Sequence, residues 1–143
     1  MRVYLAHNFA ARDWLKSEVI PFLESKGHKV VSNWITDDRH LENSWKVESA
    51  VQDLQDIESC GALIFFADQF GIVPGEGKYV ELGCAVRAGK IIIVVGIGRC
   101  VFYNLCSVRR VTRYVDVIPY LGGDCGKLQE GSLQERFTPP EST

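Results

Sequence analysis

Residues 62–95 read ALIFFADQFGIVPGEGKYVELGCAVRAGKIIIVV, and this stretch decides the fold class. Its two ends, Ala62–Phe66 and Ile91–Val95, are apolar at every position, which is typical of strands covered on both faces in a parallel sheet. Between them, an apolar pattern of helical period predicts a helix over about residues 77–89. The stretch therefore indicates two parallel strands joined by a crossover helix.

The same alternation of strand and helix extends from this unit toward both ends of the chain. Apolar runs at Arg2–Ala6 and at residues 29–32, and a weaker run at residues 108–112, predict three more strands. Helical patterns fill the intervals between them. We therefore predict an α/β domain that is doubly wound, a flavodoxin-like or Rossmann-like three-layer sandwich with a five-stranded parallel sheet.

The expected helices carry apolar stripes. The first, over residues 11–26, should end at Gly27 and bury Leu15, Val19, Phe22 and Leu23. Pro21 lies inside it and cannot donate to the carbonyl four residues earlier, so we expect this helix either to kink or to break. In the second helix, the stripe expected to face the sheet consists of Val47, Ala50, Val51, Leu54 and Ile57. A last short helix is expected over residues 115–121.

Length and composition indicate one globular domain. Of the 143 residues 46% are hydrophobic and 24% are charged, and we expect a single domain over residues 1–121 followed by a polar tail, residues 122–143. The net charge of −2 gives no general attraction to a nucleic acid polymer or to an anionic membrane. The sequence therefore predicts neither a nucleic acid polymer nor a membrane as a partner.

The sequence also indicates a cytoplasmic location. The longest apolar run, Ile91–Val95, is far too short to span a bilayer, and no signal-peptide pattern precedes the first strand. The five cysteines, at positions 60, 84, 100, 106 and 125, form no CxxC pair and no zinc-like spacing. We expect them to be small buried hydrophobic residues in a reducing compartment.

The fold predicts where a ligand binds. In open parallel sheets ligands bind beyond the carboxyl ends of the strands, where the strand order reverses, and here that point lies between the first and third strands. The loops at residues 6–12 and 67–77 should meet there. The second loop is rich in glycine and ends at a helix N-terminus, which suits an anion or a polar sugar. It is no P-loop, because Tyr79 stands where Ser or Thr is required, and the first loop, AHNFAAR, lacks the dinucleotide fingerprint.

Glu81 is the strongest candidate for a reactive group. It shares a helix face with Cys84, Ala85 and Ala88, so we expect a partly buried carboxylate beside the switch point; the alternative is a glutamate that only interacts with the helix dipole. In the preceding helix Asp53 lies at the edge of the apolar stripe, whereas Asp56 is expected on the opposite, solvated face. Asp53 is therefore the better second candidate, although it could also be an ordinary half-exposed residue.

Two carboxylates in one pocket suggest glycosyl chemistry, in which one attacks the anomeric carbon and another group assists departure of the leaving group. Tyr4, on the first strand, could hydrogen-bond the nucleophile, and Trp34 could stack on a base; each could equally be a core residue. His7 lies in the first of the two loops. No metal-ligand spacing and no cofactor motif is present, so neither a metal nor a cofactor is expected.

In order and spacing, five segments resemble the nucleoside 2-deoxyribosyltransferase family, which also holds deoxynucleoside 5′-monophosphate N-glycosidases and CMP N-glycosidases. They are VYLAHNF, GHKVVSNWI, DLQDIESCGALIFF, GEGKYVELGCAVRAGKIIIVVG and VFYNLCSVRRV, and the resemblance extends over about residues 1–121. It implies cleavage or base exchange at the N-glycosidic bond of a 2′-deoxyribonucleoside or its 5′-monophosphate, through a covalent glycosyl-enzyme intermediate.

The resemblance also implies a role for each matching residue. Glu81 matches the nucleophilic glutamate, Asp53 the aspartate proposed to help protonate the leaving base, and Tyr4 the tyrosine that orients the glutamate. Asn104 loosely matches the region where one transferase subunit reaches into its neighbour's site, so a homodimer or a higher homo-oligomer is expected. The candidates for substrate binding are Ala6, His7, Asn8, Trp34, Gly75, Gly77, Lys78 and Asn104.

Departures from the family pattern leave the 5′ group of the substrate open. Gly75 stands where known members have a serine or an aspartate that contacts the 5′ position, so this recognition does not carry over. Lys78 could bind a phosphate instead, or be solvated. The pair Cys60-Gly61 replaces a common Ala-Asp pair, a change that concerns packing more than chemistry.

Two other functions stay open. One is a non-catalytic nucleotide sensor or sponge that keeps the pocket without turnover. The other is a cytokinin-type phosphoribohydrolase, whose PGGxGTxxE motif resembles residues 74–81, although this chain is one residue short and lacks the second glycine and the threonine. Within the favoured function, a hydrolase and a transferase differ only in whether water or a second base enters after the first base leaves.

Overall fold

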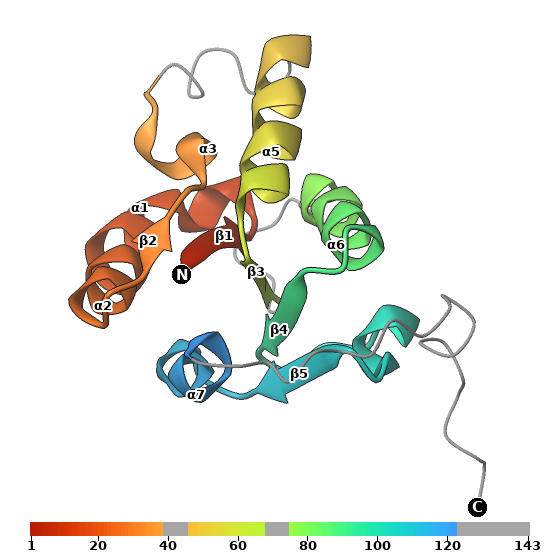
Figure 1. Cartoon of the computed structure of the whole chain (residues 1–143). Coiled ribbons are helices and arrows are strands. Elements are labelled where there is room, and N and C mark those ends of the chain that lie inside the picture. The colour runs from red at the N-terminus through yellow and green to blue at the C-terminus, as the bar shows by residue number, and fades with distance from the viewer. Residues whose placement is uncertain (39–45, 68–74, 123–143) are drawn as a thin grey trace, which may run out of the picture.

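A computed structural model describes residues 1–38, 46–67 and 75–122 of the chain. Its sheet has five strands, β1 (Arg2–Ala6), β2 (Lys29–Val30), β3 (Ala62–Phe66), β4 (Ile91–Val95) and β5 (Val108–Val111). Their order is β2-β1-β3-β4-β5, and every neighbouring pair is parallel (Figure 1). The prediction of a five-stranded parallel sheet is confirmed, and the strand order reverses between β1 and β3.

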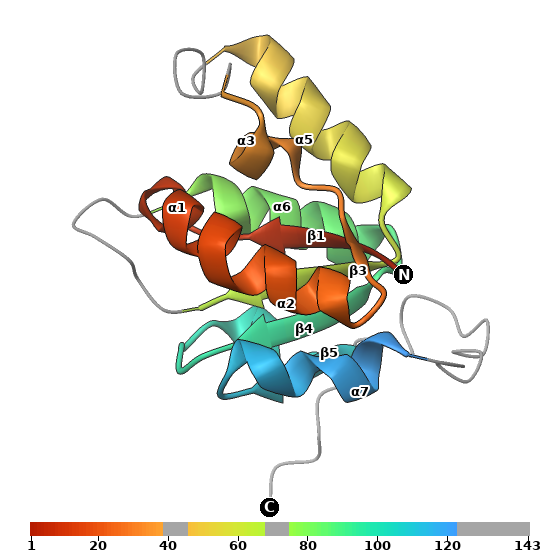
Figure 2. The ribbon, with the colours of Figure 1, turned by 90° about the vertical axis from the view of Figure 1, so that its left-hand side faces the viewer.

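Helices cover both faces of this sheet (Figure 2). On one face lie α5 (Val47–Ser59) and α6 (Gly77–Arg87), and on the other lie the first helical segment and α7 (Ile118–Leu121). Short helical turns complete the described chain, namely η1 (Phe9–Ala11), α3 (Asn33–Thr36), η3 (Val101–Asn104) and η4 (Tyr114–Val117). The predicted three-layer sandwich is confirmed. Within the described ranges, no helix is long and apolar enough to cross a membrane.

The central strands form the core because helices cover both of their sides. Every residue of β3 is buried, and so are four of the five residues in β1 and in β4. Burial of one Val, Leu or Ile side chain contributes about 1.5–3 kcal/mol. The buried apolar strands therefore stabilise the carboxyl-terminal edge of the sheet, where the site is expected.

The first helical segment contains a π-helical turn that accommodates Pro21. α1 (Arg12–Trp14) continues through this turn, η2 (Leu15–Val19), into α2 (Ile20–Ser25), and the backbone N–H of Ile20 donates to the carbonyl of Leu15, five residues earlier. Pro21 then lies at the start of α2, where a missing N–H costs little. The segment thus gains a π turn where the sequence predicted a kink or a break. It ends, as expected, at Gly27, whose φ is +82°.

β2 is two residues shorter than predicted. The backbone N–H of Val31 still donates to the carbonyl of Val3 at 2.9 Å. At Ser32 the side-chain hydroxyl oxygen instead accepts the backbone N–H of Leu5 at 2.6 Å, and α3 begins at the next residue. The early end of β2 brings Trp34, on α3, close to the end of β1, where its indole N–H donates to the carbonyl of Leu5 at 3.0 Å.

The predicted inner face of α5 is wrong. Val47, Val51 and Leu54 are 75%, 46% and 46% exposed, and Ile57 is the one member of the predicted stripe that is buried. The helix instead turns a polar stripe toward the protein, formed by Ser49, Gln52, Asp53 and Asp56. The apolar pattern gave the wrong inward face because this side of the helix lines the site and contacts α3. Polar side chains form hydrogen bonds there.

Candidate active site

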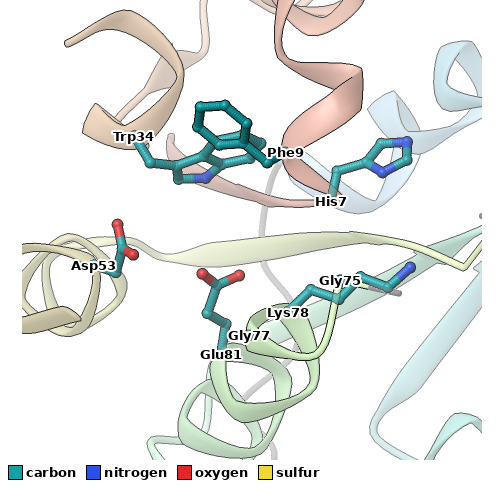
Figure 3. Close-up of a pocket in the computed structure, with 8 residues that line it drawn as sticks. All are labelled: His7, Phe9, Trp34, Asp53, Gly75, Gly77, Lys78 and Glu81. Atoms are coloured by element: carbon teal, nitrogen blue, oxygen red, sulfur yellow. The ribbon is translucent and has the colours of Figure 1, made fainter. Parts of the chain in front are cut away.

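A cavity of about 320 Å³ lies at the carboxyl ends of β1 and β3, at the predicted switch point. Figure 3 shows Asp53, from α5, and Glu81, from α6, with their carboxyl groups directed into it. The lining residues are His7, Phe9, Trp34, Asp53, Gly75, Gly77, Lys78 and Glu81. All of these except Phe9 were predicted from the sequence to belong to the site.

Tyr4 holds the carboxylate of Glu81. Its side chain is fully buried on β1, and its hydroxyl donates a hydrogen bond of 2.9 Å to Oε1 of Glu81. Burial and the neighbouring carboxylates raise the pKa of Tyr4 far above its ordinary value, so its hydroxyl stays protonated and acts as a donor. Glu81 itself is half-buried, as predicted. Its orientation therefore depends on a donor held rigidly in the central sheet.

Asp53 brings a second carboxyl group to the same cavity. It is half-buried, and its Oδ1 atom is buried without a hydrogen-bond partner in the described part of the chain. Burial, and then the charge of Asp56, raise the pKa of Asp53 to about 7. Burial, and then the charge of Asp53, raise the pKa of Glu81 to about 8. A hydrogen bond from the hydroxyl of Tyr4 acts in the opposite direction and lowers the pKa of both carboxyl groups.

Around neutral pH these two carboxyl groups share one proton. The pKa values of about 7 and about 8 lie close together, so both arrangements of that proton are populated. In one arrangement an ionised Glu81, held by Tyr4, faces a protonated Asp53. This arrangement, a nucleophile beside an acid, is the one that glycosidic cleavage requires, and it is the minor one because the higher pKa belongs to Glu81.

The two site loops are in close contact at Gly75 and Asn8. A Cβ atom added to Gly75 would clash with Oδ1 of Asn8 and lie 3.1 Å from its Cα atom. Asn8, on the loop after β1, is 2% exposed. Position 75 therefore holds glycine because the backbone of one loop packs against the side chain of the other. A polar side chain at this position, as in members of the family that the sequence resembles, has no room here.

Lys78 is buried rather than solvated. Its side chain is 3% exposed, and its ammonium group donates to the carbonyl of Phe66, at the end of β3, at 2.8 Å. The same Nζ atom lies 5.1 Å from the ring centroid of Phe65 and 5.4 Å from that of Tyr79. Of the two alternatives left open by the sequence, the solvated lysine is wrong. The cavity thus has carboxyl groups at one end and a lysine at the other (Figure 3).

Aromatic side chains line one side of the cavity, and we call Trp34 and Phe9 its aromatic roof. Trp34 is 6% exposed, and the ring of Phe9, 44% exposed, lies 6.3 Å from it between centroids. His7 stacks on Phe66 at 4.9 Å, and its Nδ1 accepts the backbone N–H of Asn8 at 2.7 Å. A neutral His7 therefore carries its proton on Nε2. Phe9 was missed because the sequence indicated its loop but gave no reason to choose its side chain.

Asp56 points inward, so the prediction of a solvated side chain is wrong. It is 5% exposed, whereas its place on the helical wheel predicted the solvated face. Its Oδ2 accepts the backbone N–H of Asn33, and its Oδ1 accepts the side-chain amides of Asn33 and Gln52, each at 2.9 Å. These bonds tie α5 to the first residue of α3, the turn that carries Trp34. A polar inward face could have been suspected from the spacing of residues 49, 52, 53 and 56.

Three predicted binding residues, Ala6, Asn8 and Asn104, are not among the residues that line the cavity. Ala6 is fully buried at the end of β1 and is not among the lining residues. Asn104 lies in η3 and lines a separate cavity with Gly98, Arg99, Cys100, Val101 and Arg110. A role for Asn104 in the site of a neighbouring subunit stays a prediction. The expectation of buried cysteines holds for Cys60, while Cys106 is exposed and Cys125 lies outside the described residues.

No protein-family model matches the sequence, and no curated protein does. Among solved structures, the chain is similar to the CMP N-glycosidase BcmB of Clostridium botulinum, with a TM-score of 0.55 and 23% sequence identity. The match covers 85% of this chain and 98% of that chain. At this identity the likeness concerns the fold, and the activity named is that of the clostridial protein.

Proposed function

We propose that this protein cleaves the N-glycosidic bond of a 2′-deoxyribonucleoside or of its 5′-monophosphate, with Glu81 as the nucleophile. The observation that carries the proposal is the 2.9 Å hydrogen bond from Tyr4 to Glu81, with Asp53 in the same cavity. An oriented carboxylate beside a second carboxyl group of raised pKa is suited to cleavage with a covalent intermediate. A fold shared with an N-glycosidase supports the same class of bond.

In the first step, a carboxylate oxygen of Glu81 forms a bond to C1′ while the bond from C1′ to the base nitrogen breaks. The electron pair of that bond leaves with the base, and Asp53 supplies the proton that neutralises it. Because Tyr4 holds Oε1 of Glu81, Oε2 is the oxygen that attacks. The product of this step is a glycosyl ester of Glu81 and a free base.

In the second step, water attacks C1′ and the ester bond breaks, which returns Glu81 as a carboxylate. Asp53, now ionised, accepts the proton of the attacking water, so the site regains its starting state. Entry of a second base instead of water gives base exchange. The enzyme is a hydrolase or a transferase according to which acceptor reaches C1′ first.

The aromatic roof supports a position for the base. Trp34 is fixed by its hydrogen bond to the carbonyl of Leu5, and Phe9 lies beside it. A base that stacks on these rings places its sugar over Glu81, near the N-terminus of α6. The substrate is then a small molecule that lies along the cavity from the carboxyl groups toward Lys78.

The decisive experiment is a substrate panel. The protein is incubated with each 2′-deoxynucleoside, each ribonucleoside and their 5′-monophosphates, and free base is measured by chromatography. Adding a second base and looking for a new nucleoside separates exchange from hydrolysis. Glu81→Gln and Asp53→Asn should lose most activity, and mass spectrometry of the quenched wild type should detect the glycosyl adduct.

Three results would contradict the proposal. Absence of free base from every substrate, together with tight nucleotide binding in calorimetry, would identify a sensor or sponge. Full activity of Glu81→Gln would exclude this residue as nucleophile. A strong preference for AMP-type ribonucleotides would favour the phosphoribohydrolase alternative.

A further inference from the structure

Asp56 is a third carboxylate beside the site, and the mechanism above gives it no role. We propose that Asp56 is a positioning residue whose fixed negative charge shifts the proton shared by Asp53 and Glu81 toward Asp53, and so raises the population of the reactive form with Glu81 ionised. The consequence for catalysis rests on the proposed function. The placement of the proton can be measured without any substrate.

The charge of Asp56 is fixed by its contacts. Both carboxylate oxygens accept hydrogen bonds, three in all, from the backbone and side chain of Asn33 and from the side chain of Gln52. Such bonds stabilise the ionised form of a carboxylate. All three donors are neutral, and no salt bridge to Asp56 occurs within the described ranges. Asp56 is therefore a buried carboxylate whose contacts in the described ranges are neutral donors, and its charge acts on Asp53.

This charge acts on Asp53 more strongly than on Glu81. Asp53 and Asp56 are three residues apart on α5, where side chains are neighbours on one helix face, whereas Glu81 belongs to α6. A nearby like charge disfavours ionisation, so Asp56 favours a protonated Asp53.

The other groups that face the pair do not separate the two carboxyl groups in this way, since the hydroxyl of Tyr4 lowers the pKa of both. From β1, Tyr4 donates to Glu81 and so favours the ionised form of that residue. α3 carries no ionisable side chain in its sequence NWIT. From α6, Lys78 directs its ammonium group to the carbonyl of Phe66. Of the groups around the pair, Asp56 is the one whose charge raises the pKa of Asp53 without a comparable effect on Glu81, so it favours the proton on Asp53.

A purely structural role for Asp56 makes a different prediction. The same hydrogen bonds hold α3 against α5, and α3 positions Trp34. Loss of that support would weaken substrate binding and raise KM without moving the proton. Asn33→Ala is the matched control, since it removes the side-chain donor to Asp56 and leaves the charge in place.

The test is a carboxyl ¹³C NMR titration of the free protein as wild type, Asp56→Asn and Asn33→Ala. In Asp56→Asn the apparent pKa of Asp53 should fall by on the order of one unit, while Asn33→Ala should titrate like the wild type. Gln52→Lys is a second variant that keeps Asp56 and places a cation four residues away from it, and it should shift Asp53 in the same direction. Unchanged titration of Asp53 in both Asp56→Asn and Gln52→Lys would overturn the inference, as would an equal shift in Asn33→Ala.

Kinetics then connect the proton to catalysis. With a substrate identified, kcat of Asp56→Asn near pH 7 should fall about tenfold, the factor that corresponds to one unit of pKa, with KM nearly unchanged. A raised KM with an unchanged pH profile would assign Asp56 a structural role only. If the wild type releases no base from any substrate, the proposed function fails, whereas the titration still decides the role of Asp56.

Discussion

Tyr4 and Glu81 lie 77 positions apart in the sequence, yet the hydroxyl of one donates to a carboxylate oxygen of the other at 2.9 Å. The bond joins β1, an interior strand of the sheet, to α6 on the face of the sheet. Tyr4 is fully buried and cannot turn away to solvent, so Glu81 has a donor in place before a substrate arrives. Preorganised donors of this kind need no rearrangement during the reaction.

Removal of this hydroxyl should slow the chemistry while leaving binding intact. Tyr4→Phe deletes one donor to a charged group, an interaction of about 1.5–3 kcal/mol, so kcat should fall about 10- to 100-fold with little change in KM. Steady-state kinetics measure this, and Tyr120→Phe, which alters a tyrosine that is 41% exposed, is the control. Wild-type kcat in Tyr4→Phe would show that the hydrogen bond does not orient the nucleophile.

The raised pKa values of Asp53 and Glu81 should cost stability at alkaline pH. Both groups bind protons more tightly in the folded protein than in the unfolded chain, where their pKa values are about 4. The free energy of unfolding therefore decreases as pH rises from about 4 through the folded values of about 7 and about 8. The pair is then least favourable to folding when both carboxyl groups are ionised.

Glu81→Gln should consequently be more stable than the wild type at pH 9, by about 2 kcal/mol, because it removes one of two buried charges. The difference should shrink to near zero below pH 4, where both carboxyl groups are protonated in either state. Urea unfolding at a series of pH values measures it, with the exposed Glu48→Gln as the control. A pH-independent difference would indicate that the glutamate is not buried with a raised pKa.

The sequence predicted the strands well because apolar runs and buried parallel strands coincide. Arg2–Ala6, Ala62–Phe66 and Ile91–Val95 were each predicted with the bounds that the structure has. These three strands also placed Tyr4 and the loops of the site, since the carboxyl ends of parallel strands share one edge of the sheet. The position of Glu81 was predicted in the same way, because it lies on the helix that follows the third predicted strand.

What the sequence could not predict depends on contacts between distant segments. The orientation of α5 was wrong because its inward face is polar, and Asp56 is buried only because Asn33 comes back to meet it. Phe9 and the close contact of Gly75 with Asn8 likewise depend on how two loops meet. A single helix pattern holds no information about such partners.

Substitution of Lys78 should show whether the substrate is a nucleotide or a nucleoside. Lys78→Met keeps the length of the side chain, which packs near the rings of Phe65 and Tyr79, and removes its charge. If the ammonium group contacts a 5′-phosphate, KM should rise about tenfold for monophosphates and remain within about twofold for nucleosides. Lys90→Met is the matched control, since that ammonium group also donates to backbone carbonyls, those of Glu58 and Cys60, but lies outside the site. Equal losses with both substrates would make Lys78 an anchor between α6 and β3.

The contact between the two site loops should make Gly75 intolerant of any side chain. In Gly75→Ala the new methyl group would clash with Oδ1 of Asn8, and its approach of 3.1 Å to the Cα atom cannot be relieved by rotating a side chain. Either loop must move, so we expect a loss of about 1–3 kcal/mol in the free energy of unfolding and a raised KM. Gly83→Ala is the control, because no heavy atom lies within 4 Å of its added Cβ and alanine stabilises a helix interior by up to about 1 kcal/mol. Denaturant unfolding of both variants measures the contrast, and a Gly75→Ala protein as stable as Gly83→Ala would mean that the two loops are not held against each other.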